Sequence, residues 1–290
     1  MKIRCRSAIR RLLCGTLKGV IAVQLFSCIA FAQESPAPPT TPASAPRVAR
    51  PSHALEPALE RAREGLAYIR ENVDDYTATI IKRERIKGKL KEHEFMFAKI
   101  RNRKVQDGKV VVPFAVYMKF LKPDSVKGRE VIWVEGKNEG KLIAHETGLL
   151  GFKRFHLPPD GLISMMGQRY PITDIGIENL VVELIERGNR DLEYPECDVK
   201  FYKKAKVDEY ICMVIDVIHP TKRDHFDYYR ARIYIDDALQ VPVRYASWSW
   251  PETPGGELLL EEEYTYRNIK LNVGLTDKDF DPDNPAYAFP

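Results

Sequence analysis

Alternation of apolar and polar residues between positions 111 and 146 constrains the fold of this chain more than any other feature. Side chains of an extended strand point to opposite faces in turn, so each alternating run predicts a strand with one apolar face. Turn signals at Lys122-Pro123-Asp124 and at 136–140 divide the stretch into a meander of three strands. The apolar positions are Phe114, Val116, Met118 and Phe120, then Val131 and Trp133, then Leu142 and Ala144. What covers this apolar face therefore decides what the chain can do.

The same pattern recurs on both sides of the meander. Further runs with a period of two residues lie at 76–86, 94–101, 199–204, 210–219, 228–236, 240–250 and 258–269. In one of them, the apolar face is formed by Ile211, Met213, Ile215 and Val217. Asp107-Gly108 marks a tight hairpin turn. Together the runs predict about ten strands.

Two segments have the period of a helix instead. Residues 57–72 carry apolar side chains at helical spacing, and Pro57 suits a first helical turn. A second helix is predicted after Thr173-Asp174, which can cap it, and Gly188-Asn189 is expected to end it. Each helix has one apolar stripe that must be buried.

These elements define the expected architecture. A single antiparallel sheet of this length curls, and it buries one face. The helices are the available cover for that face. The sequence therefore predicts an α+β domain over residues 57–290, in which a curved antiparallel half-barrel is covered by two or more helices.

The N-terminus has the features of a secretory signal peptide over residues 1–32. A basic segment precedes an apolar stretch, and Ala30-Phe31-Ala32 forms a cleavage site. One alternative is an uncleaved anchor over residues 12–32, which Lys18 disfavours because a charge is costly inside a membrane. A second is a lipid anchor on Cys28, which ends a loose lipobox. We expect a periplasmic protein, associated with the membrane only through an N-terminus that is lipidated or uncleaved.

A Pro- and Ala-rich linker over residues 33–56 separates this signal from the folded domain, because such a composition cannot form a packed core. The charge of the chain also differs between its parts. Residues 1–32 hold six of the 45 basic residues and no acidic one, which leaves 39 basic against 41 acidic residues. Because nucleic-acid binding requires a strong basic surface, we expect no nucleic-acid partner.

Cys197 and Cys212 remain after removal of the signal peptide. In an oxidising compartment such a pair can form a disulfide. The hairpin register instead places Cys212 opposite about residue 202. Two small buried side chains are the alternative.

No catalytic or metal-binding pattern stands out. His145 and His156 do not have the spacing of a zinc-binding H-E-x-x-H motif, and Ser164 lies outside any G-x-S-x-G turn. The other candidate cation ligands are three neighbours in a predicted turn, Asp224, His225 and Asp227. We expect a protein that is not an enzyme and that uses no metal and no cofactor.

Several longer motifs resemble a bacterial envelope family known as domain of unknown function 1571. The motifs lie at 76–79 and 82–85, 113–120, 128–131, 166–173, 234–236 with 241–244, and 263–266 with 271–275. The layout is also similar, more distantly, to the lipoprotein carriers LolA and LolB and to the sensor RseB. That resemblance implies a LolA-like half-barrel with a helical lid and a hydrophobic cavity for acyl chains. The carriers hold their ligand with an arginine on an early strand, and no counterpart is evident in this sequence.

The expected function follows from the apolar face and the resemblance together. Flexible Met side chains suit an adaptable apolar surface, and ligand pockets favour barrel mouths. We expect a cavity that binds a lipid or an acylated protein. Its predicted lining is Phe114, Val116, Met118, Phe120, Trp133, Met165, Met166, Met213, Ile215, Ile233 and Ile235. The alternative is a module that binds an envelope protein or senses a signal, with a cavity filled by its own side chains.

Overall fold

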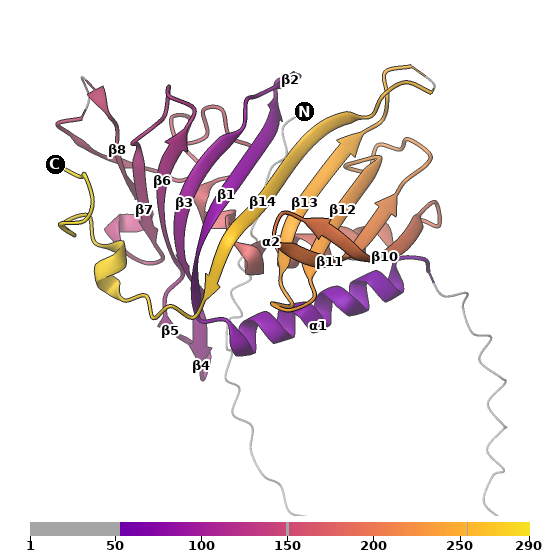
Figure 1. The fold of residues 1–290 in the computed structure, drawn as a ribbon, viewed down its shortest axis with the longest axis horizontal. Helices are drawn as coiled ribbons and strands as arrows, with labels where there is room; N and C mark the ends of the chain where they lie inside the picture. The colour runs from indigo at the N-terminus through magenta and orange to yellow at the C-terminus, as the bar shows by residue number, and fades with distance from the viewer. Residues whose placement is uncertain (1–52, 149–150, 254) are drawn as a thin grey trace, which may run out of the picture. The chain divides into compact units, whose positions relative to one another are not determined.

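One antiparallel sheet runs through most of the described chain (Figure 1). The computed structural model describes residues 53–148, 151–253 and 255–290. The predicted signal peptide, including Cys28, and the predicted linker as far as residue 52 lie outside the described residues. All of the described residues belong to one unit of the chain, Ala49–Pro290.

The main sheet contains twelve of the strands in the described residues. Its order is β10 (Asp198–Val207), β11 (Tyr210–Ile218), β12 (Arg230–Asp236), β13 (Pro242–Ser249), β14 (Leu259–Leu271), β1 (Asp75–Ile86), β3 (Glu94–Arg101), β6 (Ala115–Lys122), β7 (Glu130–Val134), β8 (Leu142–His145) and β9 (Arg154–Leu157). The short strand β2 (Lys89–Leu90) pairs with β1, and β4 (Lys104–Gln106) with β5 (Lys109–Val112) forms a separate hairpin. The first long strand, β1, thus lies at the centre of the sheet beside the last, β14.

All ten predicted strands are present, and the open curved sheet confirms the predicted fold class. The structure adds β2, β4, β5 and β9. These strands have two to four residues each, which is too short for a period of two to be recognised in the sequence.

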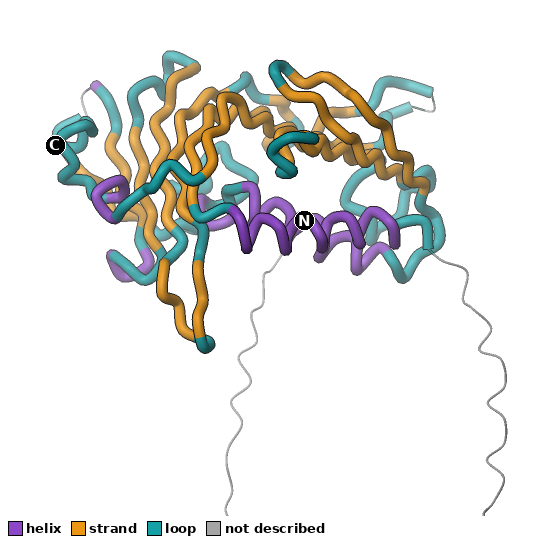
Figure 2. The backbone as a smooth tube through the Cα atoms, turned by 60° about the horizontal axis from the view of Figure 1, so that its bottom comes forward, coloured by secondary structure: helices purple, strands orange, loops and turns teal. Residues whose placement is uncertain are grey.

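Two helices, α1 (Glu56–Asn72) and α2 (Ile177–Asp191), lie side by side on one face of the sheet (Figure 2). They run antiparallel, because Arg70 near the end of α1 pairs with Glu178 near the start of α2. Within the described part of the chain, no helix combines the length and the hydrophobicity that a membrane crossing requires.

The boundaries predicted for α2 were wrong at both ends. Residues Ile172–Asp174 form a separate 3-10 turn, and α2 starts after Gly176 instead of after the predicted cap Thr173-Asp174. At the other end, α2 continues past Gly188 to Asp191. A Cβ atom on Gly188 would lie 2.7 Å from Cδ2 of Leu59, so this glycine permits close packing against α1 and is not a stop signal.

The helices and the concave face of the sheet enclose two apolar cores. We call the first the β3–β8 core; its fully buried members include Ile80, Met96, Ala98, Ile100 and Val116. We call the second the β11–β13 core; α1 covers it with buried apolar side chains, and the sheet contributes Ile215, Val217, Ala231, Ile233, Ile235 and Tyr245. The two predicted helices are therefore the cover of the concave face.

The C-terminal segment covers part of the opposite, convex face. Phe280 is buried against Tyr117 and Ile132, and Tyr287 stacks on Tyr117 with ring centroids 4.0 Å apart. Phe289 packs against the same cluster. These three aromatic residues therefore anchor the C-terminal segment to the sheet.

Cys197 and Cys212 are both free and buried, and they pack into different clusters. Cys212 lies opposite Ala205, not opposite residue 202 as expected, because the turn follows Val207 directly. Of the two alternatives for the cysteines, the structure therefore shows two small buried side chains.

Candidate functional site

A pocket lies between the two helices and strands β11–β13, and we call it the helix–sheet pocket. Its volume is about 70 Å³. The lining is almost entirely apolar, with Arg61 and Gln240 as the long polar side chains. The other lining residues are Leu55, Ala58, Leu59, Ala62 and Gly65 of the α1 region, Val181, Leu184 and Gly188 of α2, and Ile215, Val217, Tyr228, Ile233, Ile235 and Pro242 of the sheet side.

Strand register explains the sheet side of the pocket. Ile215 of β11 and Ile233 of β12 are direct cross-strand partners, and Ile235 lies two positions further along the same face. Their branched side chains form a continuous apolar floor. Because both strands are antiparallel and have a hydrogen-bonded neighbour on each side, this floor is fixed by the ladders of backbone hydrogen bonds.

Helix periodicity explains the side of the pocket that α1 forms, opposite the floor. Ala58, Ala62 and Gly65 are three or four residues apart, so they share one face of α1. All three are small, which leaves space between the helix and the floor. A Cβ atom on Gly65 would meet no atom within 4 Å, whereas one on Gly188 would clash with Leu59. Gly65 thus faces open space and Gly188 faces packed side chains.

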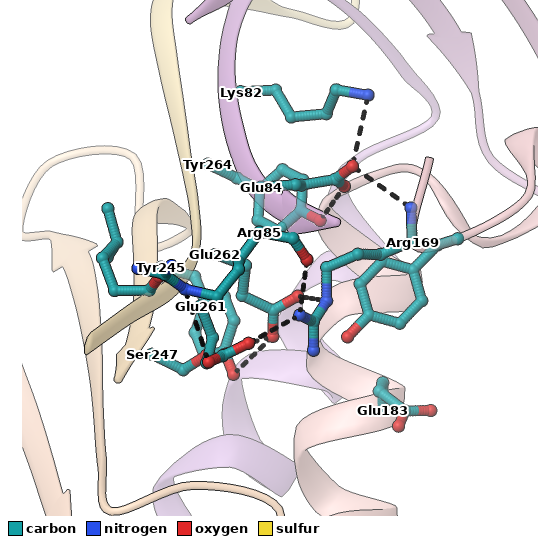
Figure 3. Close-up of polar contacts among 12 residues, drawn as sticks. Lys82, Glu84, Arg85, Arg169, Glu183, Tyr245, Ser247, Glu261, Glu262 and Tyr264 are labelled. Carbon is teal, nitrogen blue, oxygen red and sulfur yellow. Dashed lines mark hydrogen bonds and ion pairs between the residues drawn. The ribbon is translucent and has the colours of Figure 1, made fainter. Parts of the chain in front are cut away.

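A buried group of charged residues lies on the same concave face, at the end of β1 furthest from α1. We call it the ionic network; its members are Lys82, Glu84, Glu94, Arg169, Glu261 and Glu262. Figure 3 labels all of these residues except Glu94. The Lys82 ammonium lies 3.0 Å from Glu94 and 3.6 Å from Glu84. The Arg169 guanidinium lies 3.0 Å from Glu261 and 3.2 Å from Glu262.

Two carboxylates of this network, those of Glu84 and Glu262, are removed from water. Glu84 is 3% exposed and Glu262 is 1% exposed. Glu262 accepts hydrogen bonds from the hydroxyls of Tyr245 (3.3 Å) and Ser247 (3.2 Å). The Tyr264 hydroxyl donates to Glu84, and burial together with the nearby Glu262 raises the pKa of Tyr264 well above its ordinary value. Each buried carboxylate is therefore supported by cations and neutral donors.

The network also ties the segment before α2, and α2 itself, to the sheet. The backbone N–H of Arg169 donates to Glu84 at 3.1 Å. Arg187 of α2 donates to the Tyr170 hydroxyl at 2.9 Å and lies 3.7 Å from Glu262. Burial and the Glu262 carboxylate raise the pKa of Tyr170 to about 12, so its phenol stays neutral. These contacts fasten the cover of the concave face.

The histidines considered as metal ligands have other roles. His145 Nε2 lies 3.1 Å from the carbonyl oxygen of Gly151, and His156 is exposed. Asp227 pairs with Arg190 of α2 at 3.0 Å, and His225 stacks on Tyr194. Among the residues that the structure describes, no group of three or more His, Cys, Asp or Glu side chains is placed to hold a metal ion.

The structure separates the predicted cavity residues into three groups. The first group, Ile215, Ile233 and Ile235, lines the helix–sheet pocket, and Met213 packs against the β11–β13 core. The residues of the central meander belong to the β3–β8 core instead and do not line this pocket: Phe114, Val116, Met118, Phe120 and Trp133. There, the apolar face predicted from the meander is filled by neighbouring side chains.

Met165 and Met166 form the third group and belong to neither of the two apolar cores, so their place in a ligand cavity stays a prediction. Met166 is 73% exposed, and neither residue lines the helix–sheet pocket. Both lie in a turn-rich segment that has no strand or helix to direct its side chains inward.

The ionic network was missed because its charged residues resemble an ordinary exposed strand end. A usable signal was present: Lys82 and Glu84 continue the alternation of Tyr76, Ala78 and Ile80, so they must point to the same concave face.

Comparison with known proteins places the chain in a family. The profile of one family matches residues 73–289. The chain belongs to that family, described as protein of unknown function (DUF1571). The family resemblance found in the sequence motifs is thereby confirmed. No curated protein matches this member of the family.

Several solved structures are similar to it at low identity. Lipoprotein LppX from Mycobacterium tuberculosis is 12% identical, with 76% of this chain and 98% of that chain covered and a TM-score of 0.40. A LolA superfamily protein from Nitrosomonas europaea is 11% identical, with 77% and 97% covered and a TM-score of 0.28. A DUF1329 family protein from Desulfovibrio piger is 13% identical, with 79% and 98% covered and a TM-score of 0.38.

Proposed function

We propose that this protein is a non-catalytic component of the cell envelope that binds the acyl chain of a lipid or of an acylated protein in the helix–sheet pocket. The observation that carries the proposal is the lining of that pocket. Two helices and three strands present apolar side chains to one space, and Gly65 leaves part of that space open. The proposal invokes no metal and no cofactor.

The energetics favour a hydrocarbon ligand. Each methylene removed from water contributes about 0.8 kcal/mol, so a chain of some fourteen carbons contributes on the order of 10 kcal/mol. Ordering the ligand and the protein opposes this gain. An apolar pocket offers a polar ligand no comparable gain, because the polar groups would lose their hydrogen bonds to water.

The pocket must widen to hold such a chain. Its volume of about 70 Å³ is well below the roughly 300–1,000 Å³ of small-molecule pockets. We infer that α1 and α2 move away from β11–β13 when the ligand enters. Within the β11–β13 core the helices and the strands meet through apolar side chains, and such contacts can be exchanged for apolar contacts with a ligand.

Uptake of a fluorescent fatty acid tests the proposal. The wild-type protein is expected to bind it, and Gly65→Leu is expected to weaken binding at least tenfold because the new side chain fills the open space. Ala67→Leu is the matched control, since it adds the same side chain type to the exposed side of α1. Absence of uptake by the wild type, or equal uptake by Gly65→Leu, would contradict the proposal.

A second candidate function is favoured by the small volume of the pocket. In that case the interior is filled, and the domain binds an envelope protein or acts as a sensor. The densely filled β3–β8 core fits this candidate. Native mass spectrometry separates the two: a purified protein without lipid that still captures a defined envelope partner supports the second candidate.

We also propose a periplasmic location, with residues 1–32 as a signal peptide and residues 33–56 as a linker to the folded domain. The basic and apolar segments and the Ala30-Phe31-Ala32 site support this assignment. Mass determination of the mature N-terminus tests it. A terminus at Gln33 is expected, and lipidated Cys28 or an uncleaved terminus would replace this proposal with one of its alternatives.

A further inference from the structure

The edge strand β10 differs from every other strand of the sheet in its charge. It is the last strand in the sheet order among the described residues, so one of its edges has no neighbouring strand there. Its ten residues include four exposed lysines: Lys200, Lys203, Lys204 and Lys206. The only acidic residue in the strand is Asp198.

These lysines have no carboxylate within ion-pair distance in the described part of the chain. The acidic residues around them are engaged elsewhere. Asp208, just beyond the strand, pairs with Arg267 at 3.2 Å. Asp216 lies opposite Lys200 in the register, but it is fully buried and accepts a hydrogen bond from Arg230 at 2.8 Å. The positive charge of β10 is thus available to an external anion.

Exposed aromatic side chains lie between the lysines. Phe201 and Tyr202 are each 43% exposed, and they point to opposite faces of the strand. Ile211, opposite Lys206 on β11, is 46% exposed. Aromatic side chains favour the interface between lipid headgroups and hydrocarbon, and lysines beside them attract anionic lipids.

We propose that β10 docks the protein on the surface of an anionic lipid bilayer. The positive charge of the strand favours an anionic surface as the partner. The exposed aromatic and aliphatic side chains favour a lipid bilayer, which has a hydrocarbon interior, over a partner whose surface is uniformly polar. The sequence predicts membrane association through the N-terminus alone, whereas this surface belongs to the folded domain. It also lies beside the helix–sheet pocket, because β10 pairs with β11, whose Ile215 and Val217 line that pocket.

Vesicle sedimentation tests the docking surface. The full chain is mixed with phosphatidylcholine vesicles that contain or lack phosphatidylglycerol. Each lysine near an anionic surface contributes about fivefold to partitioning. The variant with Gln at all four lysines is therefore expected to bind at least about 100-fold more weakly to the anionic vesicles. High salt is expected to weaken wild-type binding, since the screening length falls to about 3 Å at 1 M.

The control removes four lysines from other exposed positions, Lys87, Lys89, Lys91 and Lys109. It changes net charge equally, and each set includes one lysine with positive φ, Lys204 or Lys87. Both variants retain residues 1–52, so any contribution of the N-terminus to vesicle binding is shared. Equal loss in the two variants would overturn the proposal, because net charge alone would then explain binding.

Hydrogen exchange supplies a readout that needs no substitution. Slower exchange of residues 198–207 on anionic vesicles, and not on neutral ones, is expected. Protection confined to other segments would refute the docking surface. If the Gln variant self-associates while its vesicle binding is unchanged, the lysines serve to block edge-to-edge pairing of strands and the proposal fails. Capture of an acidic protein with no affinity for vesicles would also overturn it.

Discussion

The glycines on the two helices predict opposite effects of the same substitution. Gly65 lies in the interior of the 17-residue helix α1, where glycine is about 0.8–1.0 kcal/mol less favourable than alanine. A Cβ atom at this position would meet nothing within 4 Å. Gly65→Ala is therefore expected to raise the free energy of unfolding by about 1 kcal/mol.

Gly188→Ala gains the same helix propensity but must displace a neighbour. Its Cβ atom would lie 2.7 Å from Cδ2 and 3.3 Å from Cγ of Leu59, which is 3% exposed and has little room to move. Forcing an extra carbon into a packed site costs roughly 1–3 kcal/mol. We expect a net loss of about 1 kcal/mol, and hence a difference of about 2 kcal/mol between the two variants.

Urea unfolding followed by circular dichroism measures this difference. For a domain of this size, about 2 kcal/mol corresponds to roughly 4–8 °C in melting temperature, so thermal unfolding gives an independent check. If Gly65→Ala fails to stabilise the protein, the space beside Gly65 is not open in solution. If Gly188→Ala stabilises it equally, the close contact of the two helices is wrong.

Three further predictions concern buried ionisable groups. Glu262→Gln is expected to lower the free energy of unfolding by about 3 kcal/mol in urea, because two arginines lose a buried carboxylate. Burial raises the pKa of Asp191 to about 6 and lowers that of His219 to about 4, and the two side chains lie 3.4 Å apart. Between pH 4 and 6 the folded state holds a proton on Asp191 and the unfolded state holds one on His219, so the opposite effects of the two groups on the pH dependence of stability cancel. Relative to the wild type, Asp191→Asn should therefore gain stability as pH rises from 4 to 6 and His219→Gln should lose it; parallel melting profiles would contradict this. Burial raises the pKa of the thiols of Cys197 and Cys212 to about 12, so neither should be alkylated in the folded protein, and both should react after denaturation, as peptide mass spectrometry can show.

Strand positions were predictable because period-two patterning and burial coincide in this chain. Tyr76, Ala78 and Ile80 alternate in the sequence and all three are buried on the concave face. The strand 94–101 was placed with the observed boundaries. These strands are long, and one face of each is apolar, so local pattern and tertiary burial give the same answer.

Features set by packing between distant elements could not be predicted in the same way. Gly188 has the character of a helix stop in the sequence, and its close contact with Leu59 depends on where α1 crosses α2. The position of the pocket depends on the same crossing. The meander of 111–146 has the clearest apolar face, yet its Met118 lies in a filled core, because neighbouring strands supply enough side chains to fill that half of the barrel.

The division of the concave face into a filled half and an open half has a physical cause in the sequence of α1. Near β1, Ile69 of α1 and Val73, the residue that follows the helix, place branched side chains in the β3–β8 core. Further from β1, the helix presents the small residues Ala58, Ala62 and Gly65, which line the helix–sheet pocket opposite the isoleucines of β11 and β12. A helix that had only to cover the sheet would gain stability from larger side chains at these positions, since each additional buried methylene contributes about 0.8 kcal/mol. The small residues therefore forgo stability at a place where a ligand could supply the missing contacts, and they do so on the half of the sheet that ends in the lysine-rich strand β10.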